Sequence, residues 1–139
     1  MPDVATSESA GTSAHEIPGR QVLLVEDDES VGVSLAGVLE LHGSRVTLVT
    51  SVALALALLR ERSFDVVVSD LMLDDDEGRT GFAVLAAATR LHPGLTAILI
   101  TGYPSEAIIQ RARAESRAGV LVKPLDIAEL LALLSPHRP

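Results

Sequence analysis

Short apolar runs and longer mixed segments alternate along this chain, and together they predict five strands that are each followed by a helix. The short runs are rich in Val, Leu and Ile and nearly free of charge, which is typical of strands buried on both faces of a parallel sheet. This alternation indicates the α/β class, with right-handed crossovers and helices on both faces of the sheet. We expect the strands at residues 21–25, 45–50, 65–69, 95–100 and 120–122.

The segments between the strands carry apolar residues three or four positions apart, as helices packed on a sheet do. In the first segment, Val31, Leu35 and Leu39 form such an apolar face. Ser51 and Ser105 stand where a hydroxyl would cap the second and the fourth helix. These signals predict five helices in all.

The first nineteen residues are rich in Ser, Thr, Ala and Gly, and they cannot bury enough apolar surface to offset the entropy of ordering. We therefore predict a flexible tail at residues 1–19 and one folded domain at residues 20–137. The tail lacks the basic start and apolar stretch of a signal peptide, and no later apolar run is long enough to cross a bilayer. A cytoplasmic protein is the resulting expectation.

Composition narrows the set of functions. The chain has 139 residues and no Cys, which excludes a disulfide framework and a thiolate metal site. Its formal charge of −8 works against binding to nucleic acid, because Lys and Arg carry most of the affinity for phosphates. The chain also ends one helix after Lys123, so we expect no DNA-binding module and an output through protein contacts.

Polar residues gather at the predicted carboxyl ends of the strands, which is where ligands bind in open parallel sheets. The first strand ends at Glu26 and Asp27, the third at Asp70, the fourth at Thr101 and the fifth at Lys123. A group of carboxylates favours a hard divalent cation, and Mg²⁺ usually binds one or two carboxylates and keeps several waters. The sequence therefore predicts a Mg²⁺ site at this edge of the sheet.

The same residue types suit phosphoryl transfer. A carboxylate such as Asp70 can act as a nucleophile toward phosphorus and form an aspartyl phosphate. The Lys123 ammonium would neutralise phosphoryl oxygens, and the Thr101 hydroxyl would hydrogen-bond one of them.

Taken alone, the acids after the first strand are a weak signal, because a solvated loop explains such a run equally well. Asp28 is better explained as an acid that favours the start of the first helix. The stronger signal is the order of four sites on four different strand ends.

Four segments together resemble the receiver-domain signature of bacterial two-component response regulators. The resemblance spans roughly residues 20–135 and implies a flavodoxin-like, doubly wound sheet of five parallel strands in the order 2-1-3-4-5, with five helices. It fits a stand-alone regulator and a receiver module of a hybrid histidine kinase equally well. The segments are Val22–Glu29, Val68–Leu73, Ile98–Gly102 and Val120–Pro124.

The resemblance implies a role for each residue of the metal site. Asp70 would be the phosphoacceptor and would share the Mg²⁺ ion with Asp27, a direct ligand. Glu26 would act through a water, and the backbone carbonyl of Met72 would complete the protein ligands.

The resemblance also implies how the signal passes on. Thr101 would be the switch hydroxyl and Lys123 the phosphoryl contact, with a cis Lys123–Pro124 bond. Phosphorylation would change the Thr101 loop, the fourth helix and the fifth strand, and so alter protein contacts. The implied donor is a histidine kinase or a histidine phosphotransfer protein, and the target is another protein or a second copy in a phosphorylation-dependent dimer. No nucleic acid, no membrane and no enzymatic activity beyond its own phosphorylation and dephosphorylation are expected.

Two positions depart from the common receiver pattern. Asp74 stands where Pro is common, and it opens an enlarged acidic loop at residues 74–80, which we interpret as solvated and mobile. A calcium loop is the alternative, but Gly78 takes the fifth place of the run, whereas that pattern needs Gly at the sixth. Val120 replaces the aromatic residue that many receivers use as a readout, which leads to the hypothesis that Tyr103 reports activation instead.

Two other protein classes fit less well. A haloacid-dehalogenase-type phosphatase also has an Asp nucleophile, but it needs a second Asp where this chain has Met72. A flavodoxin needs a Gly- and hydroxyl-rich loop after the first strand, where acids would repel a phosphate. The phosphatase remains the enzyme alternative to a receiver.

Overall fold

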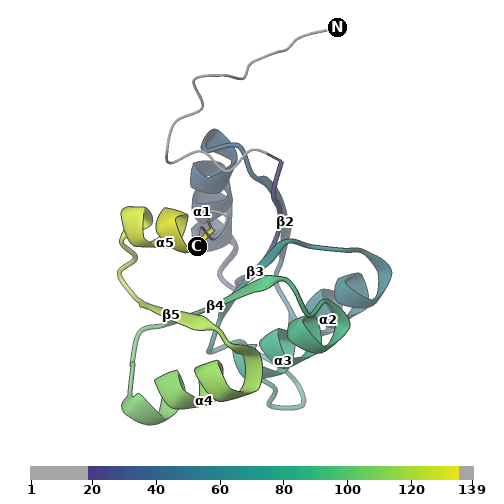
Figure 1. Ribbon diagram of the computed structural model, residues 1–139, viewed down its shortest axis with the longest axis vertical. Coiled ribbons are helices and arrows are strands. Elements are labelled where there is room, and N and C mark those ends of the chain that lie inside the picture. Colours follow the sequence, from purple (N-terminus) through teal and green to yellow (C-terminus); the bar gives the residue numbers. More distant parts are fainter. Residues whose placement is uncertain (1–18, 135–139) are drawn as a thin grey trace, which may run out of the picture.

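The computed structural model describes residues 19–134, in which five strands and five helices alternate as the sequence predicts (Figure 1). The strands are β1 (Gln21–Val25), β2 (Arg45–Val49), β3 (Val66–Asp70), β4 (Thr96–Thr101) and β5 (Gly119–Val122). The helices are α1 (Glu29–Leu41), α2 (Val52–Glu61), α3 (Gly81–Leu91), α4 (Glu106–Ser116) and α5 (Ile127–Leu134).

The five strands form one parallel sheet in the order β2-β1-β3-β4-β5, which confirms the expected flavodoxin-like order. The order reverses between β1 and β3, so the carboxyl ends of these two strands adjoin at the switch point, where ligands bind in such sheets. Val25 of β1 pairs with Ser69 of β3, and Thr101 of β4 pairs with Val122 of β5. The register therefore brings the predicted site residues to one edge of the sheet.

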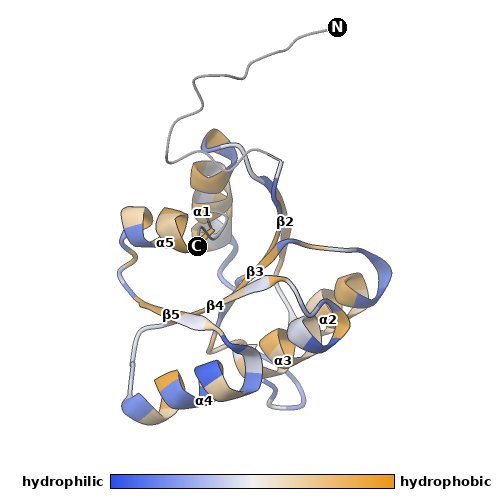
Figure 2. Ribbon diagram, viewed as in Figure 1, coloured by the Kyte–Doolittle hydropathy of each residue, from blue (hydrophilic) through white to orange (hydrophobic). Residues whose placement is uncertain are grey.

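Helices cover both faces of the sheet: α1 and α5 lie on one side, and α2, α3 and α4 lie on the other (Figure 1). Each strand divides its side chains between two cores, since successive residues point to opposite faces. Val22 and Leu24 of β1 pack under α1 and α5, whereas Leu23 and Val25 pack under α2 and α3. Figure 2 shows the resulting apolar strands and a largely hydrophilic α4.

Helix capping agrees with the sequence prediction. The side chains of Asp28, Ser51 and Ser105 accept hydrogen bonds from the first turns of α1, α2 and α4. The apolar face of α1 was only partly predicted: Leu35 and Leu39 are buried, but Val31 is 43% exposed.

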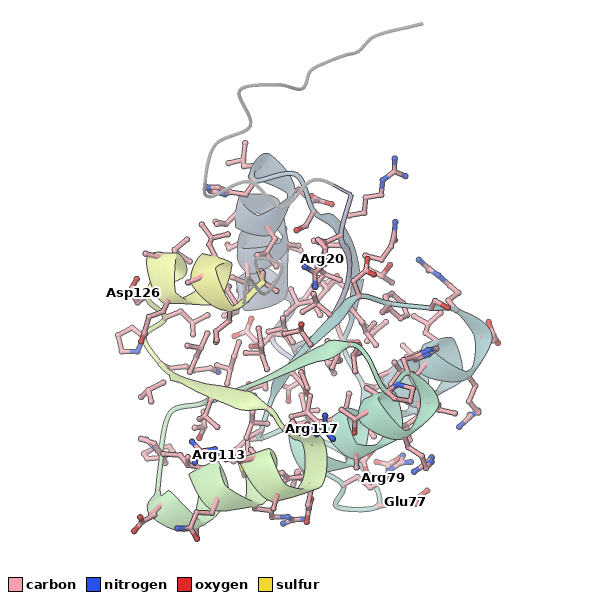
Figure 3. The ribbon with its side chains drawn as sticks, viewed as in Figure 1. Arg20, Glu77, Arg79, Arg113, Arg117 and Asp126 are labelled. Atoms are coloured by element: carbon pink, nitrogen blue, oxygen red, sulfur yellow. The ribbon has the colours of Figure 1, made fainter. Side chains whose placement is uncertain are left out.

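The ends of the described fold are joined. The Arg20 guanidinium donates a hydrogen bond of 2.8 Å to the carbonyl of Leu134, the last residue of α5 (Figure 3). The predicted tail lies outside the described residues except for Gly19, and so do residues 135–137, so both domain boundaries remain predictions. Among residues 19–134, no helix has the length and apolar character needed to cross a membrane.

Candidate functional site

Three acidic residues meet at the carboxyl ends of β1 and β3. Glu26 and Asp27 follow β1, and Asp70 is the last residue of β3. One carboxylate oxygen from each lies within 4.8 Å of the others. Glu26 and Asp70 are buried, whereas Asp27 is exposed. The structure therefore brings the predicted carboxylates together and leaves one of them open to solvent.

Lys123 reaches this cluster from the end of β5. Its Nζ donates a hydrogen bond of 3.0 Å to Oδ2 of Asp70 and lies 3.8 Å from Oε1 of Glu26. One ammonium does not neutralise three carboxylates, so the cluster keeps an excess of negative charge. Such a set of oxygen donors suits a hard cation.

The electrostatics of the cluster raise two pKa values. Burial raises the pKa of the Glu26 carboxyl, and the negative charge of Asp70 acts in the same direction, although the backbone N–H of Asp28 opposes both. Desolvation lowers the pKa of Lys123, but its hydrogen bond with Asp70 and the nearby carboxylates outweigh this effect and raise that pKa overall. Lys123 therefore stays protonated at neutral pH and can pair with anionic oxygens.

Thr101 is the last residue of β4 and is almost fully buried. Its hydroxyl accepts a hydrogen bond of 3.1 Å from the backbone N–H of Tyr103, and its carbonyl accepts one of 2.9 Å from the N–H of Lys123. Tyr103 is 85% exposed. Val120, where many receivers have an aromatic residue, is partly buried and packs on the core under α3 and α4.

Two further expectations have different outcomes. The Lys123–Pro124 peptide bond is cis, as expected. Met72 follows Leu71, whose N–H bonds to the carbonyl of Ile100, and Met72 is 66% exposed. The Met72 carbonyl as a metal ligand stays a prediction.

The interpretation of the acidic loop as solvated is wrong at Asp75. This side chain is only 6% exposed, and its carboxylate accepts bonds from the backbone N–H groups of Glu77 and Arg79 and from two nitrogens of the Arg79 guanidinium. The paired Arg79 and these backbone bonds lower the pKa of Asp75 to about 2. Figure 3 shows Glu77 and Arg79 on this loop. Because Arg79 already pairs with it, Asp75 is a structural acid, which speaks against the calcium-loop alternative.

The sequence did not predict two backbone contacts beside the site. The backbone N–H of Asp74 donates a hydrogen bond of 3.0 Å to Oδ2 of Asp27. The N–H of Gly81 bonds to the Leu71 carbonyl at 2.9 Å, and a Cβ at Gly81 would collide with the carbonyl oxygen of Asp70. The replacement of the common Pro by Asp74 was the available signal, because Pro has no N–H to donate.

Comparison with known proteins agrees with this geometry. The family model described as "Response regulator receiver domain" matches residues 22–135. The response regulator protein FleR of Pseudomonas aeruginosa is 32% identical over 117 residues, which are 84% of this chain and 24% of FleR. The sensor kinase CckA of Brucella abortus is 30% identical over 130 residues, 91% of this chain and 13% of CckA. This chain thus spans a small part of both relatives.

A shorter relative matches along most of its length. The response regulator receiver protein CpdR of Brucella abortus is 30% identical over 112 residues, which are 81% of this chain and 91% of CpdR.

Solved structures give the same result. The signal receiver domain of an HD domain-containing protein from Pseudomonas fluorescens Pf-5 superposes with a TM-score of 0.75 at 31% identity, covering 84% of this chain and 91% of that domain. A Burkholderia pseudomallei response regulator was solved with a phosphorylated aspartic acid, calcium ion and citrate. It superposes with a TM-score of 0.75 at 26% identity, covering 84% of this chain and 66% of that protein's chain. Family match, fold and strand-end residues agree, and this chain belongs to the response regulator receiver domain family of two-component signalling systems.

Proposed function

We propose that Asp70 is the phosphoacceptor of this receiver domain and that Mg²⁺ is its metal. The observation that carries the proposal is the double contact of Asp70: its carboxylate belongs to the acidic cluster and also accepts the 3.0 Å hydrogen bond from Lys123. No other carboxylate in residues 19–134 combines a place in that cluster with so short a bond to an ammonium.

The donor set fits Mg²⁺. Glu26, Asp27 and Asp70 offer carboxylate oxygens only, and Mg²⁺ prefers oxygen ligands while keeping several waters. Asp27 and Asp70 would hold the ion directly, Glu26 would act through a water, and the Met72 carbonyl would complete the protein ligands. When bound, the ion supplies positive charge to oxygens of the transferring phosphoryl group.

The residues of this chain then have separate tasks. A carboxylate oxygen of Asp70 forms a bond to phosphorus while the bond from phosphorus to the donor's histidine nitrogen breaks, and that nitrogen keeps the electron pair. Lys123 moves its hydrogen bond from the carboxylate to a phosphoryl oxygen. The Thr101 hydroxyl already accepts from Tyr103, so its own proton is free to be donated to another phosphoryl oxygen.

The output we propose is a change of protein contacts in the cytoplasm. A shift of Thr101 pulls on the N–H of Tyr103 and on the loop that leads into α4, and β5 follows through Lys123. The donor is a histidine kinase or a histidine phosphotransfer protein, and the target is a protein or a second copy of the chain. DNA and membranes are not part of this scheme.

The test is phosphorylation by a small phosphodonor with and without Mg²⁺, read by intact mass. We expect a gain of one phosphoryl group that depends on the metal and disappears in Asp70→Asn. Asp76→Asn, a change of an exposed acid in the loop after β3, serves as the control and keeps the gain. Labelling that persists in Asp70→Asn would overturn the assignment.

A further inference from the structure

One hydrogen bond at the site comes from the acidic loop at residues 74–80, for which the sequence predicted no role. The backbone N–H of Asp74 donates to Oδ2 of Asp27 over 3.0 Å and joins residues 47 positions apart. Asp27 is the exposed member of the acidic cluster, so it has less packing to fix its rotamer than Glu26 or Asp70. A charge-assisted hydrogen bond is therefore an important constraint on its carboxylate.

The loop holds this N–H in place from both sides. On one side, the bond from the Gly81 N–H to the Leu71 carbonyl closes the loop at its base. On the other side, the next residue, Asp75, is fixed by two nitrogens of the Arg79 side chain, each at 3.0 Å. Asp74 lies between these two anchors, which are made by other residues.

The bond also divides the two oxygens of Asp27. Oδ2 accepts from the loop, and this bond restricts the orientation in which the Asp27 carboxylate is presented to a cation. Partners of this kind, which hydrogen-bond a metal ligand without touching the metal, typically change metal affinity by about 10- to 100-fold.

From these contacts we infer that the main-chain N–H of Asp74 is a positioning group for the metal ligand Asp27 and that the 72–80 loop acts as its support. This inference rests on the proposed Mg²⁺ site. It assigns a function to the enlarged loop that differs from binding calcium through its own acids.

The test compares Asp74→Pro with Asp74→Ala. Both variants lose the carboxylate, but only the proline variant loses the N–H. We expect Asp74→Pro to bind Mg²⁺ about tenfold more weakly than Asp74→Ala in a calorimetric titration. In phosphorylation assays, the Mg²⁺ concentration for half-maximal rate should rise by the same factor, while the rate at saturating Mg²⁺ stays equal in the two variants.

A second measurement does not depend on the folding of the proline variant. In the wild-type protein, the Asp74 amide should be protected from hydrogen exchange, and Asp27→Ala should remove this protection while amides of the core strands keep theirs. Equal Mg²⁺ affinities for the two Asp74 variants, or an unchanged Asp74 amide in Asp27→Ala, would overturn the inference alone. If the wild-type protein binds no Mg²⁺, or Asp27→Ala binds it normally, the proposed metal site fails and the inference fails with it.

Discussion

Two acidic regions lie next to each other in this domain. The carboxylates of one have too few cationic partners, whereas the central carboxylate of the other is fully paired. At the strand ends, three carboxylates lie close together and one ammonium, that of Lys123, pairs with Asp70 and Glu26, while burial raises the pKa of Glu26. In the loop, Asp75 accepts four hydrogen bonds, two of them from one guanidinium, and its pKa falls to about 2. The first region is short of positive charge, and in the second the charge of Asp75 is fully paired.

The difference shows how to separate a ligand site from a structural acid. Carboxylates that lack enough donors are poised to take a cation, because a cation offsets their excess of negative charge. A carboxylate that is saturated by the chain gains little from a ligand. Counting acids in the sequence does not separate the two cases, whereas the partners of each acid do.

The largest difference between the two regions should appear when the cation of each is removed in turn. Lys123→Ala takes away the ammonium that contacts Asp70, and we expect its phosphorylation rate to fall roughly 100- to 1000-fold, as on loss of one donor to a developing charge. Arg79→Ala takes away the partner of Asp75 and should leave that rate near wild type at saturating Mg²⁺. Rates from intact mass over time would check both. A comparable fall in the phosphorylation rate of both variants would contradict the proposed difference between the two regions.

A smaller effect should appear in the pH dependence of stability. Asp75 has its pKa lowered from 3.8 to about 2 in the folded state, so the folded protein holds its proton less tightly than the unfolded chain does. Its contribution to stability is present above pH 3.8 and disappears as the pH falls toward about 2.

Urea unfolding of the wild-type protein and of Asp75→Asn, in EDTA, would measure this contribution. The wild-type protein should have the higher free energy of unfolding near neutral pH. The difference between the two proteins should shrink as the pH falls from 3.8 toward about 2. If the difference in free energy of unfolding is the same at every pH, the charge of Asp75 does not contribute to stability.

The smallest effect concerns the only Tyr of the chain. If the strand-end region is the one that responds to phosphorylation, the bond between the Tyr103 N–H and Thr101 should transmit a change to the exposed Tyr103 ring. We expect a modest change in tyrosine fluorescence when a phosphoryl mimic modifies Asp70, and no change in Asp70→Asn. An unaltered signal from the stoichiometrically modified protein would rule out Tyr103 as a reporter.

Much of the fold could be predicted because it rests on repeating patterns. Buried strands and amphipathic helices leave a periodic signal, and the strand-end rule then located Asp70, Thr101 and Lys123 without any knowledge of contacts. The residues that escaped prediction lie in the loop after β3. A loop has no period, and the bond from Asp74 to Asp27 depends on how two distant segments meet. The prediction that Val31 belongs to the buried face was wrong for a related reason. Helical spacing defines a face of the helix, but it does not show how far the neighbouring elements cover that face.

The hydrogen bond between Arg20 and Leu134 has a consequence for how such a domain is used in longer proteins. It brings the first and last parts of the described fold together at the amino end of β1, away from the strand ends that hold the acidic cluster. A domain whose first and last residues lie side by side can be linked to other domains through one small patch of its surface. This geometry suits a family whose matching region makes up 13% of CckA and 91% of CpdR. Neighbouring domains can then vary in number and order while the edge that would accept the phosphoryl group stays uncovered.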